Sequence, residues 1–307
     1  MKQAGIFLFL ILTTSVVFAQ QKVKLFDDAE FTVQPVNRIN TVASEIAPFF
    51  VEDLIYFSAI PEKYAGDSKR MKNHTAFYSL YAAETNENGD ISSGRALVPG
   101  FGADFHEGPA AYCALTGELF VTLSNVVGIN TRQELKQTEK IRLRLVIKKQ
   151  VNNRWQTVEE LPFNDKRFHF AHPAINKTGD TLIFSSDMDS LNYGNTDLYM
   201  SVREYGEWSA PVNLGSYINT KGNEMFPTFL PNGMLSFATD GRTIKYGGLD
   251  IYYVAFPKLE KVEIFGEEIN SPADDFHLIT DHSGKSGYFT SNRSQTTSDD
   301  LYRFIIE

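Results

Sequence analysis

The sequence predicts an all-β fold in which one antiparallel unit is repeated, and three observations support this. A short motif, Ile-Asn-Thr or Ile-Asn-Ser, occurs at 39–41, 218–220 and 269–271. Each copy is followed by an acid five residues after its Asn: Glu45, Glu224 and Asp275. Five segments show the same order of short β-rich runs, and no stretch keeps a helical period after the N-terminal apolar run. Such reuse of one unit is typical of a repeat architecture.

Each segment begins with a strand that is marked by Pro or, in the last segment, by Leu: Pro48, Pro109, Pro173, Pro227 and Leu278. A polar turn follows, and the second strand then ends in small, mostly hydroxylated residues. We expect the second strands at 54–58, 118–122, 181–185, 234–238 and 287–291. We expect the third strands at 77–82, 141–148, 197–201, 250–255 and 300–306.

The order of strands also predicts how the fold closes. Four segments continue into a fourth strand, after hairpin turns such as Asn152-Asn153. The last segment stops at its third strand, whereas residues 31–41 resemble an internal fourth strand because they run into the first Ile-Asn-Thr motif. We therefore expect the N-terminal strand to complete the last sheet. The predicted fold is a five-bladed β-propeller of four-stranded antiparallel blades, closed by that strand.

The composition is that of a folded domain, and it disfavours some partners. Hydrophobic residues make up 42% and aromatic residues 13% of the 307 residues. We expect residues 20–307 to form a single propeller domain. The chain has 29 basic and 38 acidic residues and a formal net charge of −9, which argues against nucleic acid and an anionic membrane as partners. The lone Cys113 is expected to be a buried thiol without a disulfide.

Residues 1–19 have the pattern of a secretory signal peptide. Lys2 provides the basic start, 6–18 is an apolar run, and Val17-Phe18-Ala19 fits a cleavage site. The run is too short to span a bilayer, so we expect no membrane span after cleavage. The mature protein is expected to be exported to the periplasm, the outer membrane or the cell surface. A retained membrane anchor is the alternative interpretation.

Several further motifs resemble those of a known family: His-Glu-Gly-Pro at 106–109, Leu-Pro-Phe-Asn at 161–164, Gly-Asn-Glu-Met-Phe-Pro at 222–227, Gly-Gly-Leu-Asp-Ile-Tyr at 247–252 and Ser-Asn-Arg at 291–293. Nearly the whole mature chain resembles the WD40-like propeller repeats of bacterial envelope proteins. In Bacteroidetes-type relatives such propellers precede a peptidoglycan-binding OmpA-like domain, and some are linked to type IX secretion and gliding. The resemblance carries over no catalytic residue set. Since this sequence ends with the last blade, it implies contact with peptidoglycan only through a partner.

The propeller geometry places several titratable side chains on one face. Connections between blades and loops between second and third strands share a face, because the innermost strand comes first. Six side chains are expected to ring the channel mouth there: Glu45, His106, Glu107, His172, Glu224 and Asp275. Converging carboxylates and imidazoles are suited to binding a cation or ligand, or to acid–base catalysis. The alternative, which the repetition favours, is that each acid accepts hydrogen bonds from nearby backbone N–H groups and joins blades.

Two loops on the same face are long and basic, at 59–76 and 125–140. Their candidate binding residues are Lys63, Lys69, Arg70, Lys72, Arg132 and Lys136. The alternative interpretation, to which the sequence gives equal weight, is that both loops are solvated surface insertions without a binding role. The Asp before three of the third strands, at 197, 250 and 300, is expected to cap a turn. A calcium loop with Asp187 and Asp189 is disfavoured because it lacks the later ligand and Gly. We expect no metal and no cofactor.

These observations favour a non-enzymatic function. We expect an exported propeller that binds an envelope protein or peptide, as a scaffold or accessory subunit of an envelope assembly. The sequence contains no familiar hydrolase, phosphate-loop or metalloprotease motif. One alternative is a carbohydrate-active enzyme that uses Glu45, Glu107, Glu224 and Asp275, since some five-bladed propellers are glycosidases. A weaker third possibility is sensing of a small ligand in the channel.

Overall fold

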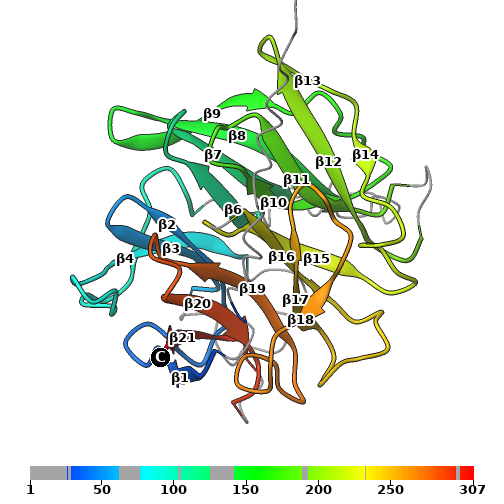
Figure 1. The fold of residues 1–307 in the computed structure, drawn as a ribbon. Coiled ribbons are helices and arrows are strands. Elements are labelled where there is room, and N and C mark those ends of the chain that lie inside the picture. The colour runs from blue at the N-terminus through cyan, green and yellow to red at the C-terminus, as the bar shows by residue number, and fades with distance from the viewer. Residues whose placement is uncertain are drawn as a thin grey trace, which may run out of the picture.

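The computed structural model describes residues 26, 29–61, 77–102, 105–124, 142–188, 193–231, 233–294 and 298–307. Within these residues, strands form five antiparallel sheets arranged as the blades of a propeller (Figure 1). The predicted five-bladed all-β fold is confirmed. The predicted signal peptide lies outside the described residues. In the described part of the chain, no helix has the length and apolar character needed to cross a membrane.

The blades follow one another along the chain. Blade 1 consists of β2 (Glu45–Val51), β3 (Leu54–Ala59), β4 (Ser79–Glu84) and β5 (Ala96–Leu97). Blade 2 consists of β6 (Glu107–Cys113), β7 (Glu118–Ser124), β8 (Leu143–Val151) and β9 (Arg154–Glu160). Blade 3 consists of β10 (Phe170–Ile175), β11 (Thr181–Ser186), β12 (Asp197–Glu204), β13 (Glu207–Trp208) and β14 (Val212–Asn213).

The last two blades complete the ring. Blade 4 consists of β15 (Glu224–Phe229), β16 (Met234–Thr239), β17 (Asp250–Ala255) and β18 (Glu263–Ile264). Blade 5 consists of β19 (Asp275–Thr280), β20 (Ser286–Ser291), β21 (Asp300–Ile306) and β1 (Phe31–Pro35). Every predicted second and third strand is present, and β17 and β21 have the predicted bounds. In blade 3 the fourth position is divided between β13 and β14, which both pair with β12.

The N-terminal strand closes the ring as predicted. β1 pairs antiparallel with β21, from Phe31 opposite Ile306 to Pro35 opposite Tyr302, and the two strands lie side by side in Figure 1. The strand is shorter than the expected 31–41, because Pro35 has no N–H group to donate and the chain then turns. The Val36 N–H still donates to the Leu301 carbonyl at 2.9 Å, so the chain stays joined to blade 5.

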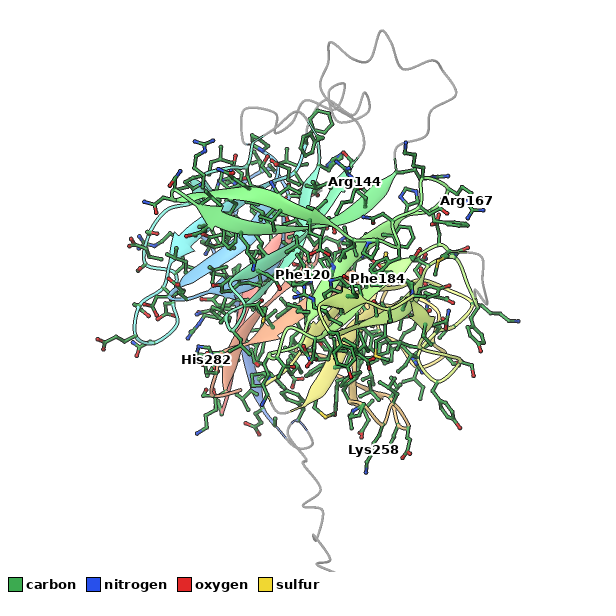
Figure 2. The ribbon with its side chains drawn as sticks, turned by 90° about the horizontal axis from the view of Figure 1, so that it is seen from above. Phe120, Arg144, Arg167, Phe184, Lys258 and His282 are labelled. Carbon is green, nitrogen blue, oxygen red and sulfur yellow. The ribbon has the colours of Figure 1, made fainter. Side chains whose placement is uncertain are left out.

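Apolar side chains fill the space between neighbouring blades. Phe120 of blade 2 and Phe184 of blade 3 belong to one cluster, and both are fully buried. Figure 2 shows these two rings in the interior, with Arg144, Arg167, Lys258 and His282 towards the outside. The lone Cys113 is buried and forms no disulfide, as expected. Packing between sheets therefore holds the blades together.

Each innermost strand carries a β-bulge at the same place. The register shifts in β2, β6, β10, β15 and β19, and one residue in each has a positive φ: Ala47, Gly108, His172, Phe226 and His277. We call these five the inner bulge residues. Non-glycine residues rarely adopt this conformation, so the surrounding sheet must hold it. A bulge re-aims its side chain, and it thereby sets what lies along the centre of the propeller.

Closure of the ring should depend on the inward face of β1. Val33 is partly buried against the cluster that includes Phe304, whereas Gln34 is exposed. We expect Val33→Asp to lower the free energy of unfolding by about 1–3 kcal/mol, because it buries a carboxylate against an apolar core. Gln34→Asp introduces the same side chain on the outer face and should change it by less than about 0.5 kcal/mol. Urea unfolding measures both, and equal effects would contradict closure through β1.

Candidate functional site

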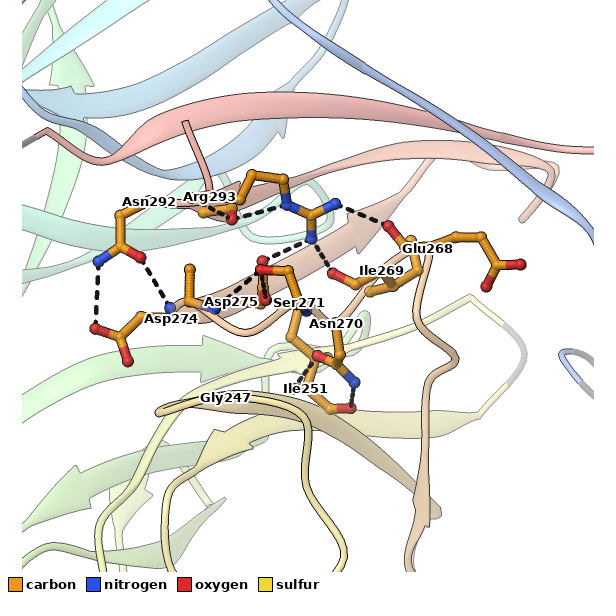
Figure 3. A network of polar contacts seen from close by, with 12 residues as sticks. Gly247, Ile251, Glu268, Ile269, Asn270, Ser271, Asp274, Asp275, Asn292 and Arg293 are labelled. Atoms are coloured by element: carbon orange, nitrogen blue, oxygen red, sulfur yellow. Dashed lines mark hydrogen bonds and ion pairs between the residues drawn. The ribbon is translucent and has the colours of Figure 1, made fainter. Parts of the chain in front are cut away.

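The repeated Asn joins the connection between blades to the third strand. The Leu198 N–H donates to Asn219 Oδ1 at 2.8 Å, and Asn219 Nδ2 donates to the Leu198 carbonyl at 3.0 Å. Asn270 makes the same pair of bonds with Ile251, at 2.7 and 3.0 Å, and Figure 3 shows both. Asn40 repeats the pattern on Leu301 in blade 5. The Asn side chain thus continues the ladder of the sheet by one more pair.

Blade 2 uses an Asn outside the repeated motif for the same purpose. Asn164 accepts a hydrogen bond from the Leu145 N–H at 3.0 Å and donates one to the Leu145 carbonyl at 2.8 Å. It lies in the Leu-Pro-Phe-Asn segment at 161–164. The amide group, rather than the surrounding motif, is therefore what this connection shares with those that contain Asn40, Asn219 and Asn270.

The repeated acid accepts hydrogen bonds from other residues of its own connection. Glu224 accepts hydrogen bonds from the Thr220 N–H at 2.8 Å, from Thr220 Oγ1 at 2.6 Å and from Thr239 Oγ1 at 2.6 Å. Glu45 accepts from the N–H and the hydroxyl of Thr41, at 2.9 and 2.8 Å, and pairs with Arg95. Both acids have 0% exposed surface. Their oxygen atoms are thus occupied inside the connection.

Asp275 occupies the equivalent position in blade 5 and shows the fullest network (Figure 3). It accepts from the N–H and the hydroxyl of Ser271 at 2.6 and 2.7 Å, and from the Arg293 guanidinium at 2.6 Å. Arg293 also donates to the Glu268 and Ile269 carbonyls. Asp275 is 0% exposed, so this carboxylate is an internal partner of Arg293.

The backbone of each acid joins one blade to the next. The Glu45 N–H donates to the Asp299 carbonyl at 2.9 Å, and the Glu224 N–H donates to the Thr196 carbonyl at 2.7 Å. The Asp275 N–H donates to the Leu249 carbonyl at 2.7 Å. Each acceptor immediately precedes the third strand of the preceding blade. The acids therefore act as joints between blades, which is the alternative to a binding or catalytic role that the sequence left open.

Glycines allow this close approach of neighbouring blades. An added Cβ at Gly194 would lie 2.3 Å from the Gly222 carbonyl oxygen, and one at Gly247 would lie 2.1 Å from the Ala273 carbonyl oxygen. The neighbouring N–H groups use this proximity, since Asn195 donates to the Gly222 carbonyl at 2.9 Å. Loops after the second strands thus lie against the connections, on one face that we call the connection face.

Burial dominates the electrostatics of two acids. It raises the pKa of Glu45 and of Glu224 above the usual value for glutamate, while hydrogen bonds from Thr41 and Thr220 oppose the rise. A raised pKa in an accessible pocket would favour a general acid. These carboxylates have no exposed surface, however, and their partners are the chain's own donors. The raised pKa of Glu45 and of Glu224 therefore follows from their burial inside the connections and does not indicate a general acid.

In blade 2 a different set of residues occupies the corresponding place. Glu107 is 1% exposed and accepts a hydrogen bond from the Gly102 N–H at 2.5 Å. Its own N–H donates to the Tyr78 carbonyl at 2.9 Å, while the Tyr78 N–H donates to His106 Nδ1 at 3.2 Å. Both candidates therefore join blade 2 to blade 1, as the acids of blades 1, 4 and 5 join theirs.

The structure brings His172 to aromatic rings on neighbouring blades. The His172 ring stacks on Phe226 with 4.0 Å between ring centroids, and His172 Nδ1 lies 2.9 Å from Ser185 Oγ. Phe226 also meets the edge of His277 at 6.0 Å. His277 Nε2 in turn lies 3.0 Å from the Pro48 carbonyl oxygen. These contacts connect the innermost strands of blades 3, 4, 5 and 1.

Burial keeps both imidazoles neutral. It lowers the pKa of His277 to about 4, and the pKa of His172 to about 3 with a further contribution from nearby His277. His277 is only 3% exposed, whereas His172 keeps part of its surface. Sequence reasoning did not include Phe226 or His277 among the candidates. Their position could have identified them, because Phe226 directly precedes Pro227 and His277 directly precedes Leu278, the residues that mark the first strands of blades 4 and 5.

Other candidates fall into two groups. The six basic loop residues, Lys63, Lys69, Arg70, Lys72, Arg132 and Lys136, lie outside the described residues. The Asp residues before the third strands cap their loops: Asp197 accepts from the Tyr193 N–H at 2.8 Å, and Asp250 accepts from the Tyr246 N–H at 2.8 Å. Among the residues that the structure describes, no three potential metal ligands come together.

The connection face also carries exposed apolar side chains. Tyr217 lies in the connection after blade 3 and is 70% exposed, and Ile244 in the next loop is 75% exposed. Arg242, in that same loop, donates to the Tyr217 carbonyl at 2.8 Å, which places the two segments side by side. Tyr246 follows and is 44% exposed. We call Tyr217, Ile244 and Tyr246 the blade 4 patch.

Solved structures share this fold at low sequence identity. A thermostable family-43 glycoside hydrolase aligns over 89% of this chain and 92% of its own, with 12% identity and a TM-score of 0.52. A protein of unknown function from Dyadobacter fermentans aligns over 90% and 99%, with 8% identity and a TM-score of 0.52. A protein assigned as TolB from Agrobacterium tumefaciens aligns over 88% and 79%, with 14% identity and a TM-score of 0.45. These likenesses concern the fold alone, and no family model or curated protein matches the sequence.

Removal of a repeated acid should cost stability. Glu224→Ala leaves three donors without an acceptor, two on the partly buried Thr220 and one on the buried Thr239, so we expect a loss of about 2–5 kcal/mol in the free energy of unfolding. Glu267→Ala removes an exposed acid from the neighbouring connection and should change it by less than about 0.5 kcal/mol. Urea unfolding of the two variants tests this, and a loss no larger than that of the control would contradict a structural role.

The neutral His277 predicts loss of stability in acid. Its pKa is about 4 in the folded protein against 6.5 for the free side chain, so the unfolded chain binds the proton first as the pH falls. The contribution is complete above pH 6.5, and about 2 kcal/mol of it is lost between pH 7 and pH 5. His277→Asn, in which Asn tolerates a positive φ, should remove this share of the loss and leave the share that comes from the lowered pKa of His172. The same substitution at the exposed His282 is the matched control, and a wild-type slope in His277→Asn would refute the assignment.

Proposed function

We propose that this protein is a non-catalytic, exported β-propeller that binds a protein or peptide of the bacterial cell envelope. It would serve there as a scaffold or as an accessory subunit of an assembly, in the manner of the envelope propellers that its repeats resemble. The main support for this proposal is a contrast on the connection face, where the carboxylates are buried and apolar side chains are exposed.

The buried carboxylates favour a non-catalytic role. Glu45, Glu107, Glu224 and Asp275 are 0–1% exposed, and each has hydrogen-bond donors from its own surroundings. A glycosidase needs two carboxyl groups that reach the substrate and a water molecule. Acids that fasten the connections between blades cannot also reach a substrate and a water molecule unless the fold opens.

The exposed side chains favour a macromolecular partner. The blade 4 patch presents two tyrosines and an isoleucine, and Tyr193 and Val42 are exposed elsewhere on the same face, at 46% and 72%. Tyrosine is enriched at protein interfaces because its ring buries much apolar area at little entropic cost. Single exposed apolar residues need no explanation, but neighbouring ones on a functional face of a propeller do.

The location follows from the N-terminal sequence and from the family resemblance. Residues 1–19 fit a signal peptide, and the quoted repeats resemble envelope propellers, some of them linked to secretion and gliding. A partner in the periplasm or at the outer membrane is therefore proposed. The basic residues of loops 59–76 and 125–140 are proposed to assist binding on the same face.

A carbohydrate-active enzyme is the alternative. Its candidates are the four acids named above, and it would require at least two of them to become accessible. Hydrolysis of a plant or bacterial polysaccharide by the purified protein, abolished by Glu224→Gln, would establish this alternative and overturn the proposal.

The proposal predicts a stable partner in envelope extracts. The tagged mature protein should capture one protein reproducibly, and Tyr217→Ser with Ile244→Ser should weaken the interaction about tenfold or more. The control is Leu115→Ser with Tyr205→Ser, which removes equally exposed apolar side chains from turns on the opposite face. Reversal of Lys69, Arg70 and Lys72 to Glu tests the basic loop separately.

Binding assays with the purified partner distinguish the outcomes. Loss in the blade 4 patch variant with retention in the control supports the proposed face. Equal affinity of all variants, or loss in the control alone, would place binding elsewhere and contradict it.

A further inference from the structure

A small cavity lies at the other end of the innermost strands. It has a volume of about 150 Å³, is partly open to solvent, and is lined by residues from the first strand of all five blades, among them Phe49, Ala111, Tyr112, Phe229, His277 and Thr280. The acids stand at the beginning of these strands, whereas most of the lining comes from their second halves. The cavity is therefore on the side away from the connection face.

The inner bulge residues separate the cavity from the acids. The stacked rings of His172 and Phe226, with His277 edge-on to Phe226, lie between the first residues of the strands and the cavity lining. His277 belongs both to this layer and to the lining. The two ends of the propeller centre thus have different chemistry, with buried carboxylates at one end and an aromatic-walled cavity at the other.

Two buried polar groups of the lining have no hydrogen-bond partner. They are His277 Nδ1 and Thr280 Oγ1, on side chains that are 3% and 8% exposed. His277 Nε2 faces the Pro48 carbonyl at 3.0 Å and must donate to it, so Nδ1 of the neutral ring carries the lone pair. Thr280 offers a hydroxyl that can donate or accept. Buried polar groups without partners are costly, and a ligand that pairs with them recovers that cost.

The size and walls of the cavity define the ligand. An apolar cavity of about 150 Å³ in another protein accommodates one benzene ring. Here the walls include the aromatic residues Phe49, Tyr112 and Phe229, and the described residues of the lining include no Asp, Glu, Lys or Arg. Aromatic walls favour a flat ring, while an unpaired acceptor and a hydroxyl favour a ligand with one O–H or N–H donor.

We propose that this cavity is a binding site for a small uncharged aromatic ring that bears a hydroxyl group, of the phenol class. The ring packs against the aromatic walls, and its hydroxyl donates to His277 Nδ1 while it accepts from Thr280 Oγ1. The site lies away from the connection face, so it does not depend on the proposed protein partner.

Titration of the full mature protein with three probes tests the site. Ligand-observed NMR or calorimetry would compare phenol with toluene, which lacks the donor, and with benzoate, which is charged. We expect saturable binding of phenol at least about tenfold tighter than that of toluene, and no binding of benzoate. No saturable binding of phenol, or equal affinity for phenol and toluene, would overturn the proposal.

Two variants locate the binding. Ala111→Phe fills the cavity and should abolish phenol binding, whereas Thr280→Val keeps the side-chain shape and should weaken phenol severalfold without affecting toluene. The Thr280 variant keeps the test valid if the bulky substitution does not fold. Tyr217→Ser with Ile244→Ser, on the connection face, should bind phenol like the wild type. Undiminished phenol binding in a folded Ala111→Phe protein would place the ligand elsewhere and refute this site.

Discussion

The structure depends on the way each connection is fastened to the blades that it joins. An Asn amide such as Asn219 pairs with both backbone groups of a third-strand residue, and a buried acid such as Glu224 gathers the N–H and hydroxyl groups of the same connection. The acid's own N–H then bonds to the preceding blade. Backbone groups that leave a sheet need partners when they are buried. In the three connections that contain it, the repeated motif supplies these partners at a fixed place, so hydrogen bonds as well as apolar packing join those blades to their neighbours.

The same constraint determines the centre of the propeller. Because the acids are used in the connections, they contribute little reactive surface at the connection face. The bulge that follows them turns one residue per blade into a positive φ, and His172, Phe226 and His277 stack as a result. This layer separates the acids from the cavity between the strand ends. The proposed recognition of a protein by exposed loops and the proposed recognition of a small ring by the cavity therefore involve different ends of one scaffold.

Much of this architecture was predictable because its causes are local and repeated. The pairing of β1 with β21 follows from the fourth-strand pattern before the first Ile-Asn-Thr motif, and the blade count follows from five Pro- or Leu-marked segments. The central stack was not predictable in this way. A positive φ is uncommon for any residue other than Gly, and the assembled sheets impose it on Phe226 and His277. Likewise, His106 and Glu107 do not follow the repeated motif, and no sequence signal marks the division of the fourth strand of blade 3 into β13 and β14.

The central claim is that the repeated acids are joints between blades, and amide hydrogen exchange tests it most directly. The N–H groups of Glu224 and Asp275 bond across blades at 2.7 Å, inside connections with no exposed carboxylate. The account predicts that both amides exchange only through global unfolding, with the same free energy as the amides of the buried second strands. Exchange of these two amides by local opening, several kcal/mol below the global value, would show that the connections open on their own and would contradict the account.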